Sequence, residues 1–285
     1  GHGAARMLGG LTVPWRTPAL KLVGLFPGPP WSRRYLARRA HFVRTMHDDQ
    51  AILNRFAAGE PLPDGYGIGL DERCVEYPWL FAHQPGGLVL DAGSTLNQRF
   101  ILDRLLPRIA ALHVATLAYE GIAYPERDVS YVFADLRDLP FRDGLFDTVV
   151  CISTLEHVGM DNTSYAAGAT ASGDPVRDRL KAAGELRRVT KPGGRLLITV
   201  PYGRREDHGW LQQLDADDVR DLAAAVGDAT VSVYEYHPGG WQLSDLDQAA
   251  GLSFGDGVPA ARAVACLAAV QRDHDRALQP PVSPL

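Results

Sequence analysis

Acidic, glycine and small polar residues follow short apolar runs at several points in the middle of the chain. The first of these points reads Asp91-Ala92-Gly93-Ser94, directly after the apolar residues 88–90. Glycine lets the backbone turn tightly and approach a ligand closely. A carboxylate there can accept hydrogen bonds from a ligand amine or from the amides of the turn itself. Because plain strand-to-helix turns have the same composition, this turn alone is weak evidence for a binding site.

Further polar residues follow the later apolar runs. Asp135 ends one run, and His157 follows another run at 146–152. A histidine has an ordinary pKa of about 6.5, so it can remove a proton from a hydroxyl group near neutral pH. A packing role for His157 stays open. His208 lies on a loop after the next run, beside Asp207, where a solvated loop is the alternative to a catalytic role.

The elements that would position these residues alternate between strand-like and helix-like patterns from residue 87 onward. Strands are predicted at 88–91, 112–117, 131–134, 146–152, 195–200, 230–236 and 263–270, and helices at 97–106, 179–190 and 215–226. This alternation predicts an α/β fold, a doubly wound, mostly parallel, seven-stranded Rossmann-like sheet with an antiparallel edge strand. In such open sheets ligands bind outside the carboxyl ends of the strands, where the polar residues lie.

The first 80 residues have a different character. Residues 7–30 are rich in proline and glycine and predict an irregular arm, followed by one helix over 33–58 that ends at Gly59. Pro78 predicts a break before the main fold. We therefore expect an N-terminal arm and helix at 1–80, acting as a cap or docking segment, and the main binding domain at 81–285.

Charge is unevenly distributed along the chain. Residues 1–47 contain eight Lys or Arg and no Asp or Glu, whereas the net charge of the whole chain is −5. With Trp15 and Trp31, the basic arm could associate weakly with an anionic surface, and a solvated helix face is the alternative. The acidic main body argues against nucleic-acid binding, which needs a basic groove over many phosphates. The oligomeric state stays open.

Several classes of protein are not indicated. No run approaches the roughly 18 consecutive apolar residues of a membrane-spanning helix, and no secretory signal is present, so we expect a cytoplasmic protein. Three distant cysteines without a Cys-x-x-Cys pair argue against zinc and against a disulfide framework. Asp215, Asp217 and Asp218 cluster at a helix start, where acids complement the helix dipole, so we predict no metal.

Taken in order, the motifs resemble those of the class I S-adenosylmethionine-dependent methyltransferases. One large group of that family reads acid-x-Gly, acid-x-x-x-Leu-Pro-Phe, Phe-Asp-x-Val with Leu-Glu-His-Val, and then Lys-Pro-Gly-Gly. The matching segments of this sequence are Asp91–Gly93, Asp135–Phe141, Phe146–Val158 and Lys191–Gly194, and the resemblance covers about residues 85–270. A nicotinamide-binding fold fits less well, because the Gly-x-Gly-x-x-Gly turn that receives a pyrophosphate is missing.

The resemblance implies S-adenosyl-L-methionine as the cofactor. It places the glycine turn beneath the methionine part, an acid near the second strand on the ribose hydroxyls, and the acid after the third strand, with the following backbone, near the adenine amine. The cofactor-binding residues expected from it are Asp91, Gly93, Ser94, Asn97, Glu120, Asp135, Leu136 and Ser153. Two departures bear on cofactor affinity. Thr95 and Asn97 replace two of the usual three glycines, and the second strand has no acid at its tip.

The expected activity is methyl transfer, in which the protein aligns the acceptor and removes a proton when the acceptor is a hydroxyl group. We expect O-methylation of a small molecule such as a sugar or a natural-product intermediate. A carboxylate or peptide-end methyltransferase is one alternative, and a catalytically weak binding or scaffold protein of the same fold is another.

Candidate residues for catalysis and for the acceptor follow from their positions. His157, His208 and His237 are the candidate bases, and His157 and His208 are the expected catalytic residues. The loop over 159–178 is about 20 residues long, and loops of that length are often functional lids. The residues expected to contact the acceptor are Asp161, Asn162, Tyr165, Tyr202 and Trp241. Glu76, Tyr77 and Trp79 could close the cofactor pocket from the N-terminal side, or simply pack.

Overall fold

A computed structural model of the chain describes residues 29–227 and 229–272. Nearly all of the predicted arm, including Trp15, therefore lies outside the described residues. Trp31 is inside them, is 52% exposed, and contacts the ring of Tyr35 edge-on at the start of the first helix.

The structure contains one large sheet with the strand order β3-β2-β1-β4-β5-β10-β8-β9. Its strands are β1 (Leu88–Ala92), β2 (Ala111–Thr116), β3 (Val129–Phe133), β4 (Phe146–Ile152), β5 (Thr190–Tyr202), β8 (Thr230–His237), β9 (Gly240–Ser244) and β10 (Ala263–Val270). The strands β1 to β5 are parallel, β10 is antiparallel to β5 and β8, and β9 forms an antiparallel edge. The predicted fold class is confirmed, with β9 as an additional strand.

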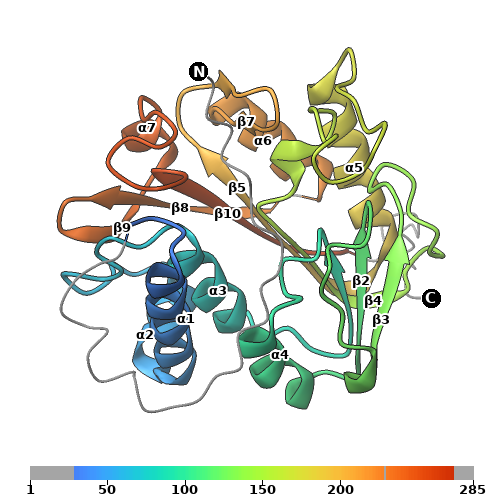
Figure 1. Cartoon of the computed structure of the whole chain (residues 1–285), viewed down its shortest axis with the longest axis horizontal. Coiled ribbons are helices and arrows are strands. Elements are labelled where there is room, and N and C mark those ends of the chain that lie inside the picture. Colours follow the sequence, from blue (N-terminus) through green and yellow to red (C-terminus); the bar gives the residue numbers. More distant parts are fainter. Residues whose placement is uncertain (1–28, 228, 273–285) are drawn as a thin grey trace, which may run out of the picture.

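Helices cover both faces of this sheet (Figure 1). One face carries α1 (Arg33–Asp48), α2 (Gln50–Ala58), α3 (Arg73–Ala82) and α4 (Arg99–Leu105), and the other carries α5 (Pro175–Val189), α6 (Ala216–Ala225) and α7 (Leu246–Ala249). The strand β4 shows why, because Val150 and Ile152 enter one core and Val149 and Cys151 enter the other. A strand buried on both faces reads as a continuous apolar run.

The helices before residue 80 share one hydrophobic core with the sheet. Tyr35 of α1, Phe56 of α2 and Trp79 of α3 are buried in the same cluster as Val150 and Tyr234. The face that they cover is therefore part of the main fold. Among the helices of the described residues, none combines the length and the apolar character needed to cross a bilayer.

The single helix predicted over 33–58 is wrong, because two helices occupy this range. Asp49 lies between them in an extended conformation, and its carboxylate accepts hydrogen bonds from the backbone N–H groups of Ala51 and Ile52. An aspartate that caps a new helix competes with continuation of the old one. The apolar stripe continues across this break, which is why its spacing suggested one helix.

The break predicted at Pro78 is also wrong, because Pro78 lies inside the buried helix α3. A proline inside a helix removes one N–H group, so the carbonyl four residues earlier loses its helical partner. Here that carbonyl belongs to Cys74, and it accepts a hydrogen bond of 2.8 Å from the Tyr66 hydroxyl. Tyr66 thus replaces the missing bond and allows α3 to continue.

Candidate active site

The candidate site lies where the strand order reverses between β1 and β4. The chain passes from β1 to β2 and β3 on one side of β1, whereas β4 and β5 pair on its other side. The crevice outside the carboxyl ends of the strands at such a point is where open α/β sheets bind ligands. The residues that follow β1, β2, β3 and β4 therefore meet at one edge.

The turn after β1 is organised by Asp91. This side chain is fully buried, and its two oxygens accept hydrogen bonds from the backbone N–H groups of Thr95 (3.2 Å) and Leu96 (2.8 Å). Burial, together with the nearby charge of Glu120, raises the pKa of Asp91 to about 7, although the hydrogen bonds from Leu96 and Thr95 oppose this rise. Asp91 thus fixes the conformation of the turn through its backbone N–H groups.

Gly93 allows the turn to pass close to β4. Its φ angle is +118°, and a Cβ atom at this position would lie 2.1 Å from Oγ1 of Thr154. Ser94 follows with a φ of +64° and is buried. Among the described residues, nothing accepts a hydrogen bond from the Ser94 N–H group. This turn therefore presents a backbone donor that the protein leaves free.

Asn97 is used by the protein itself. Its amide nitrogen donates to the carbonyl of Ile122 at 3.0 Å, and its amide oxygen accepts from the Tyr131 hydroxyl at 2.8 Å. These bonds tie the turn after β1 to the connection between β2 and β3. The following helix begins only at Arg99.

Glu120 lies beyond the end of β2 in sequence but folds back over it. Its carboxylate accepts a 2.7 Å hydrogen bond from Thr116, the last residue of β2, and another from the Ser94 side chain. Partial burial raises the pKa of Glu120. The structure thus brings Glu120 to the strand end that lacks an acid of its own.

Asp135 follows β3 and is held by Arg137. Both carboxylate oxygens accept from the Arg137 guanidinium, which also pairs with Asp178 of α5 at 2.5 Å. Although partial burial opposes it, these bonds lower the pKa of Asp135. The N–H of Leu136 has no acceptor among the described residues. Arg137 was missed in the sequence, where the only signal was its place two residues after the acid.

The end of β4 is joined to the N-terminal helices through Glu76. Oε1 of this buried side chain accepts hydrogen bonds from the hydroxyls of Ser153 and Thr199, both at 2.6 Å, and Oε2 pairs with Arg73. Tyr77 of the same helix donates to the carbonyl of Thr95. The helix α3 is therefore hydrogen-bonded both to the turn after β1 and to the end of β4. Arg73 was missed in the sequence analysis, although an arginine three residues before Glu76 in an otherwise apolar helix is a signal.

His157 stands after β4 in a defined tautomer. Its Nδ1 lies 2.8 Å from the carbonyl oxygen of Trp210, which can only accept, so we assign the proton to Nδ1. Burial lowers the pKa of His157, although the bond to Trp210 opposes this. A neutral ring with a proton on Nδ1 has a free electron pair on Nε2. His157 can therefore act as a base through Nε2.

His208 is not brought to His157. It lies in the turn between β6 (Glu206–Asp207) and β7 (Gln212–Gln213), where its Nε2 is 3.3 Å from Glu206 and its ring packs on Phe254. The same hairpin supplies the Trp210 carbonyl, so it supports His157 through its backbone.

The loop after His157 is closed by its own hydrogen bonds. The Asn162 amide donates to the carbonyl of His157 at 2.7 Å, and Asp161 accepts from the backbone and side chain of Thr163. Tyr165 is 38% exposed, and its ring faces that of His157 at 6.1 Å. Of the three expected acceptor residues here, Tyr165 contacts the ring of His157 and is partly exposed, whereas Asn162 positions His157.

Tyr202, the last residue of β5, and Trp241 of β9 have side chains that point into the core. Both are fully buried. The Tyr202 hydroxyl donates to the carbonyl of Leu246, and Trp241 Nε1 donates to the carbonyl of Leu70 at 2.9 Å. Their polar atoms are satisfied in the core, so the structure does not place them where an acceptor would bind.

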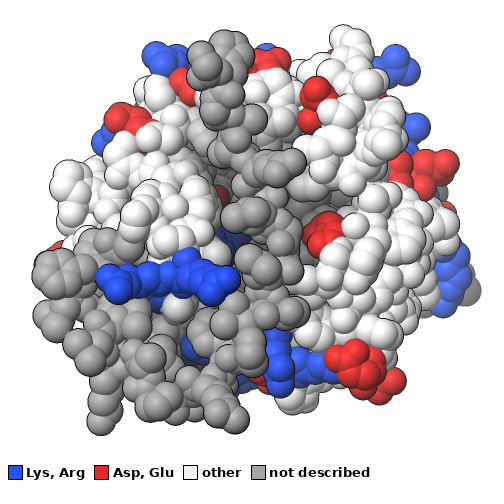
Figure 2. All heavy atoms as spheres, in the orientation of Figure 1, with Lys and Arg blue, Asp and Glu red and all other residues white. Residues whose placement is uncertain are grey.

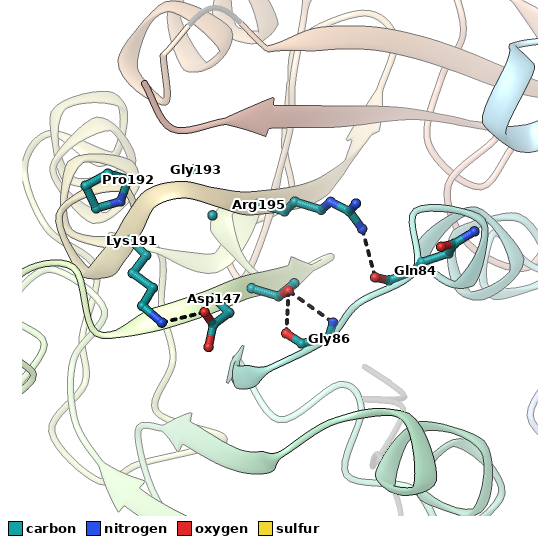
Figure 3. Close-up of a pocket in the computed structure, with 9 residues that line it drawn as sticks. Gln84, Gly86, Asp147, Lys191, Pro192, Gly193 and Arg195 are labelled. Carbon is teal, nitrogen blue, oxygen red and sulfur yellow. Dashed lines mark hydrogen bonds and ion pairs between the residues drawn. The ribbon is translucent and has the colours of Figure 1, made fainter. Parts of the chain in front are cut away.

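An open hollow of about 440 Å³ lies at the opposite, amino-terminal edge of the sheet (Figure 3). Its charged side chains are all engaged: Lys191 pairs with Asp147, and Arg195 donates to the carbonyl of Gln84 at 2.8 Å. These bonds join the strand starts to each other. The hollow contains none of the strand-end residues described above, and we do not assign it a ligand.

Charged groups are scattered over the surface of the described residues (Figure 2). On the face shown in Figure 2, acidic and basic side chains of the described residues form separate small patches among neutral atoms. Within residues 29–227 and 229–272, no three His, Cys, Asp or Glu side chains are arranged to hold a metal ion. Asp215 and Asp218 instead form a capping box at the start of α6.

Comparison with known proteins gives a match to one family. Residues 109–198 match the family model described as a methyltransferase domain. An uncharacterised protein of Methanocaldococcus jannaschii is 29% identical over 120 residues, which cover 42% of this chain and 43% of that protein. The chain thus matches less than half the length of this curated relative.

Two solved structures are also similar. One is a 1,6-didemethyltoxoflavin N1-methyltransferase of Burkholderia thailandensis, with a TM-score of 0.45 and 15% identity over 86% of this chain and 93% of that one. The other is the N-methyltransferase NodS of Bradyrhizobium japonicum, with a TM-score of 0.44 and 14% identity over 82% of this chain and 98% of that one.

Proposed function

We propose that this protein is an S-adenosylmethionine-dependent methyltransferase that acts on a small molecule. The match of residues 109–198 to the model of the methyltransferase-domain family supports this proposal. The observation that carries this proposal is the set of polar groups at the switch point, where the turn after β1, Glu120 beyond β2 and Asp135 after β3 share one edge. We thus propose the methyl-transfer activity, S-adenosylmethionine as the cofactor and a small molecule as the acceptor together.

The polar groups at this edge fit the parts of the proposed cofactor. Adjacent strands lie about 4.8 Å apart, so the ends of β1 and β3, with β2 between them, are separated by about 10 Å. The Leu136 N–H and the Asp135 carboxylate suit the acceptor and donor edge of an adenine, and the Glu120 carboxylate suits a ribose diol. Arg73, which keeps N–H groups beyond its pair with Glu76, suits a carboxylate. When bound, the cofactor supplies an electrophilic methyl group.

We further propose that the acceptor atom is a hydroxyl oxygen and that His157 is the base. The Trp210 carbonyl fixes the ring, and Nε2 then takes the hydroxyl proton as the oxygen becomes nucleophilic. Tyr165 and the loop that follows His157 would cover the acceptor and exclude water. His208 is not included in this step, because it is paired with Glu206.

An acceptor screen scored by release of S-adenosylhomocysteine tests this proposal. With an active acceptor found, His157→Ala is expected to lower kcat/KM by about 100-fold or more, because a positioned general base contributes about that much. His41→Ala, at an exposed position on α1, is the matched control and should leave the rate unchanged. Retention of most activity in His157→Ala would instead favour a carboxylate or peptide-end acceptor, which needs no base.

One observation favours the second candidate, a binding or scaffold protein with little catalytic activity. The Thr154 side chain packs directly on Gly93, and Thr95 and Asn97 replace two of the three glycines that the resemblance to the methyltransferase family leads us to expect. Side chains in these places reduce the room at the turn. Calorimetric titration with S-adenosylhomocysteine separates the two candidates, because no binding at millimolar concentrations would contradict the methyltransferase proposal.

A further inference from the structure

The β6–β7 hairpin carries the carbonyl that fixes His157, and its own backbone pairing is weak. Within the described residues its two strands form a separate sheet, and its backbone pairing with the large sheet is limited to one bridge at the end of β5. A two-stranded hairpin by itself is only marginally stable in water. The carbonyl of Trp210 nevertheless accepts from Nδ1 of His157 at 2.8 Å. The carbonyl of Gly209 likewise accepts from the N–H of Asp161 at 3.0 Å. The hairpin therefore needs anchors of another kind.

Arg179 of α5 provides such an anchor from the core. Its side chain is 1% exposed, and Nη1 donates to Oε1 of Gln212 in β7 at 2.9 Å. Gln212 is also buried and lies two residues after Trp210. Hydrogen bonds from a charged donor are roughly twice as strong as those between neutral groups. The strand that follows the Trp210 carbonyl is thus attached to α5 by a strong, directional bond.

Asp218 of α6 fixes the arginine in turn. It is 2% exposed, and its Oδ1 accepts from Nη2 of Arg179 at 2.7 Å. Its Oδ2 accepts from Nε of Arg205, the residue directly before β6, at 2.9 Å. Both strands of the hairpin are therefore connected to the same buried ion pair. Apolar side chains of similar volume can often replace a buried ion pair without loss of stability, but they would not fix the direction of the Gln212 side chain.

We propose that Arg179 and Gln212 are positioning residues for His157, which act on it through the β6–β7 hairpin. Arg179 holds Gln212, and Gln212 holds β7, so the Trp210 carbonyl stays where it accepts the proton of Nδ1. The bond at one ring nitrogen decides which tautomer a histidine adopts. The network thereby keeps the electron pair of Nε2 free for a hydroxyl proton. This inference rests on the proposed function, in which His157 is the base.

The helix α5 also contacts the opposite side of the site. Asp178, directly before Arg179, pairs with Arg137, which holds Asp135 after β3. Adjacent residues of a helix point in directions that differ by about 100°. One turn of α5 is therefore hydrogen-bonded both to the residues after β3 and, through Gln212, to the hairpin beside His157. This placement suits a helix that positions groups on both sides of the site.

Nitrogen NMR spectra of His157 test the proposal without any need for activity. They distinguish a ring N–H group from an unprotonated ring nitrogen, and comparison with His157→Ala assigns the signals. Above pH 7, where the ring is neutral, we expect one tautomer with the proton on Nδ1 in the wild type. Gln212→Met removes the acceptor of Arg179 and should give the averaged signals of two tautomers. A wild-type tautomer in Gln212→Met would overturn the proposal.

Three further variants separate positioning from a general loss of folding. Gln212→Glu keeps an acceptor for Arg179 and should retain the wild-type tautomer. Gln248→Met, at an exposed position of α7, is the matched control and should also retain it. Arg179→Lys keeps the charge beside Asp218 but lacks the planar fork that reaches two acceptors, so it should behave like Gln212→Met and replaces that variant if it does not fold. Equal loss of the tautomer in Gln212→Glu and Gln212→Met would refute the role of the bond.

Steady-state kinetics give a second measurement once an acceptor is found. Gln212→Met should lower kcat by about tenfold or more and leave KM for the acceptor nearly unchanged, because a misplaced base weakens the transition state and not the binding of the substrate. A raised KM with an unchanged kcat would contradict the proposal. If the wild type methylates no acceptor, the proposed function fails, whereas the NMR comparison still decides whether Arg179 and Gln212 position His157.

Discussion

At the scale of single residues, the candidate site depends on side chains that hold the backbone in place and so leave a few polar groups free. Asp91 bonds the turn amides, Asn97 ties the neighbouring connection, and the Trp210 carbonyl fixes His157. What remains for a ligand are the N–H groups of Ser94 and Leu136 and the carboxylates around them.

The first prediction at this scale concerns Gly93, where a side chain meets both backbone strain and a neighbour. Gly93→Ala places a Cβ atom 2.1 Å from Thr154 at a φ of +118°. We expect the free energy of unfolding to fall by more than the roughly 1–2 kcal/mol that a positive φ alone costs, and S-adenosylhomocysteine binding to be lost. Urea denaturation and calorimetry measure these effects.

Gly255→Ala is the matched control for this prediction. Gly255 also has a positive φ, +77°, but a Cβ atom there would meet nothing within 4 Å. Its cost is that of the backbone alone. If the two variants lose the same stability and both retain binding, then the close approach of Thr154 to the turn has no functional weight.

The second prediction concerns the pH dependence of catalysis. Burial lowers the pKa of His157, and only the deprotonated ring can accept a proton. As the pH is lowered, kcat/KM should therefore begin to fall only when His157 becomes protonated. The midpoint of this acid limb should lie below pH 6.5, the ordinary pKa of a histidine. An acid limb centred above pH 6.5 would argue against His157 as the base.

At the scale of secondary structure elements, α3 connects the N-terminal helices to the site. It contributes Glu76, which accepts from residues after β4 and on β5, and it contains a proline that the helix tolerates through Tyr66. Tyr66→Phe removes that donor and leaves a buried carbonyl without a partner. We expect a loss of about 1–3 kcal/mol in the free energy of unfolding by urea denaturation.

Tyr119→Phe tests whether this loss is specific to α3. Tyr119 is 63% exposed, so removing its hydroxyl should change stability very little. A weaker affinity for S-adenosylhomocysteine should accompany the stability loss in Tyr66→Phe and be absent in Tyr119→Phe. Identical behaviour of the two variants would show that the helix does not need the Tyr66 bond.

Some of the secondary structure elements could be predicted from the sequence and others could not. The bounds of β4 could be predicted correctly, because a strand buried on both faces is one apolar run. The strand β9 was missed, since it is short, begins at a glycine and pairs with β8 only through a hairpin. The places of Arg73 and Arg137 could not be predicted, because the first depends on the docking of α3 and the second on pairing with Asp178 of α5.

At the scale of the whole molecule, buried acids make stability depend on pH. Burial raises the pKa of Asp91 to about 7 and those of Glu72 and Glu156 to about 8, well above their ordinary values. The native state therefore holds protons that the unfolded state has released, and stability falls as pH rises through these values. The buried histidines, such as His47, whose pKa falls to about 3, act in the opposite direction below pH 6.5.

Between about pH 7 and 8, where the unfolded histidines have lost most of their protons, the raised acids dominate this slope. We expect the free energy of unfolding to decrease across that window in the wild type and to decrease less in Glu156→Gln, which cannot ionise. Denaturation curves at several pH values give the slope directly. The matched control is Glu60→Gln, at an exposed glutamate after α2. A slope in Glu156→Gln equal to those of the wild type and of Glu60→Gln would show that Glu156 is not held protonated.

The most direct test of the central claim is a calorimetric titration of the whole chain with S-adenosylhomocysteine. The strand-end groups at the switch point predict saturable binding at one site per chain. They also predict loss of affinity in Gly93→Ala and its retention in Gly255→Ala. No binding at millimolar concentrations by a folded chain would contradict the proposal that this crevice holds a sulfonium cofactor, and with it the methyltransferase activity.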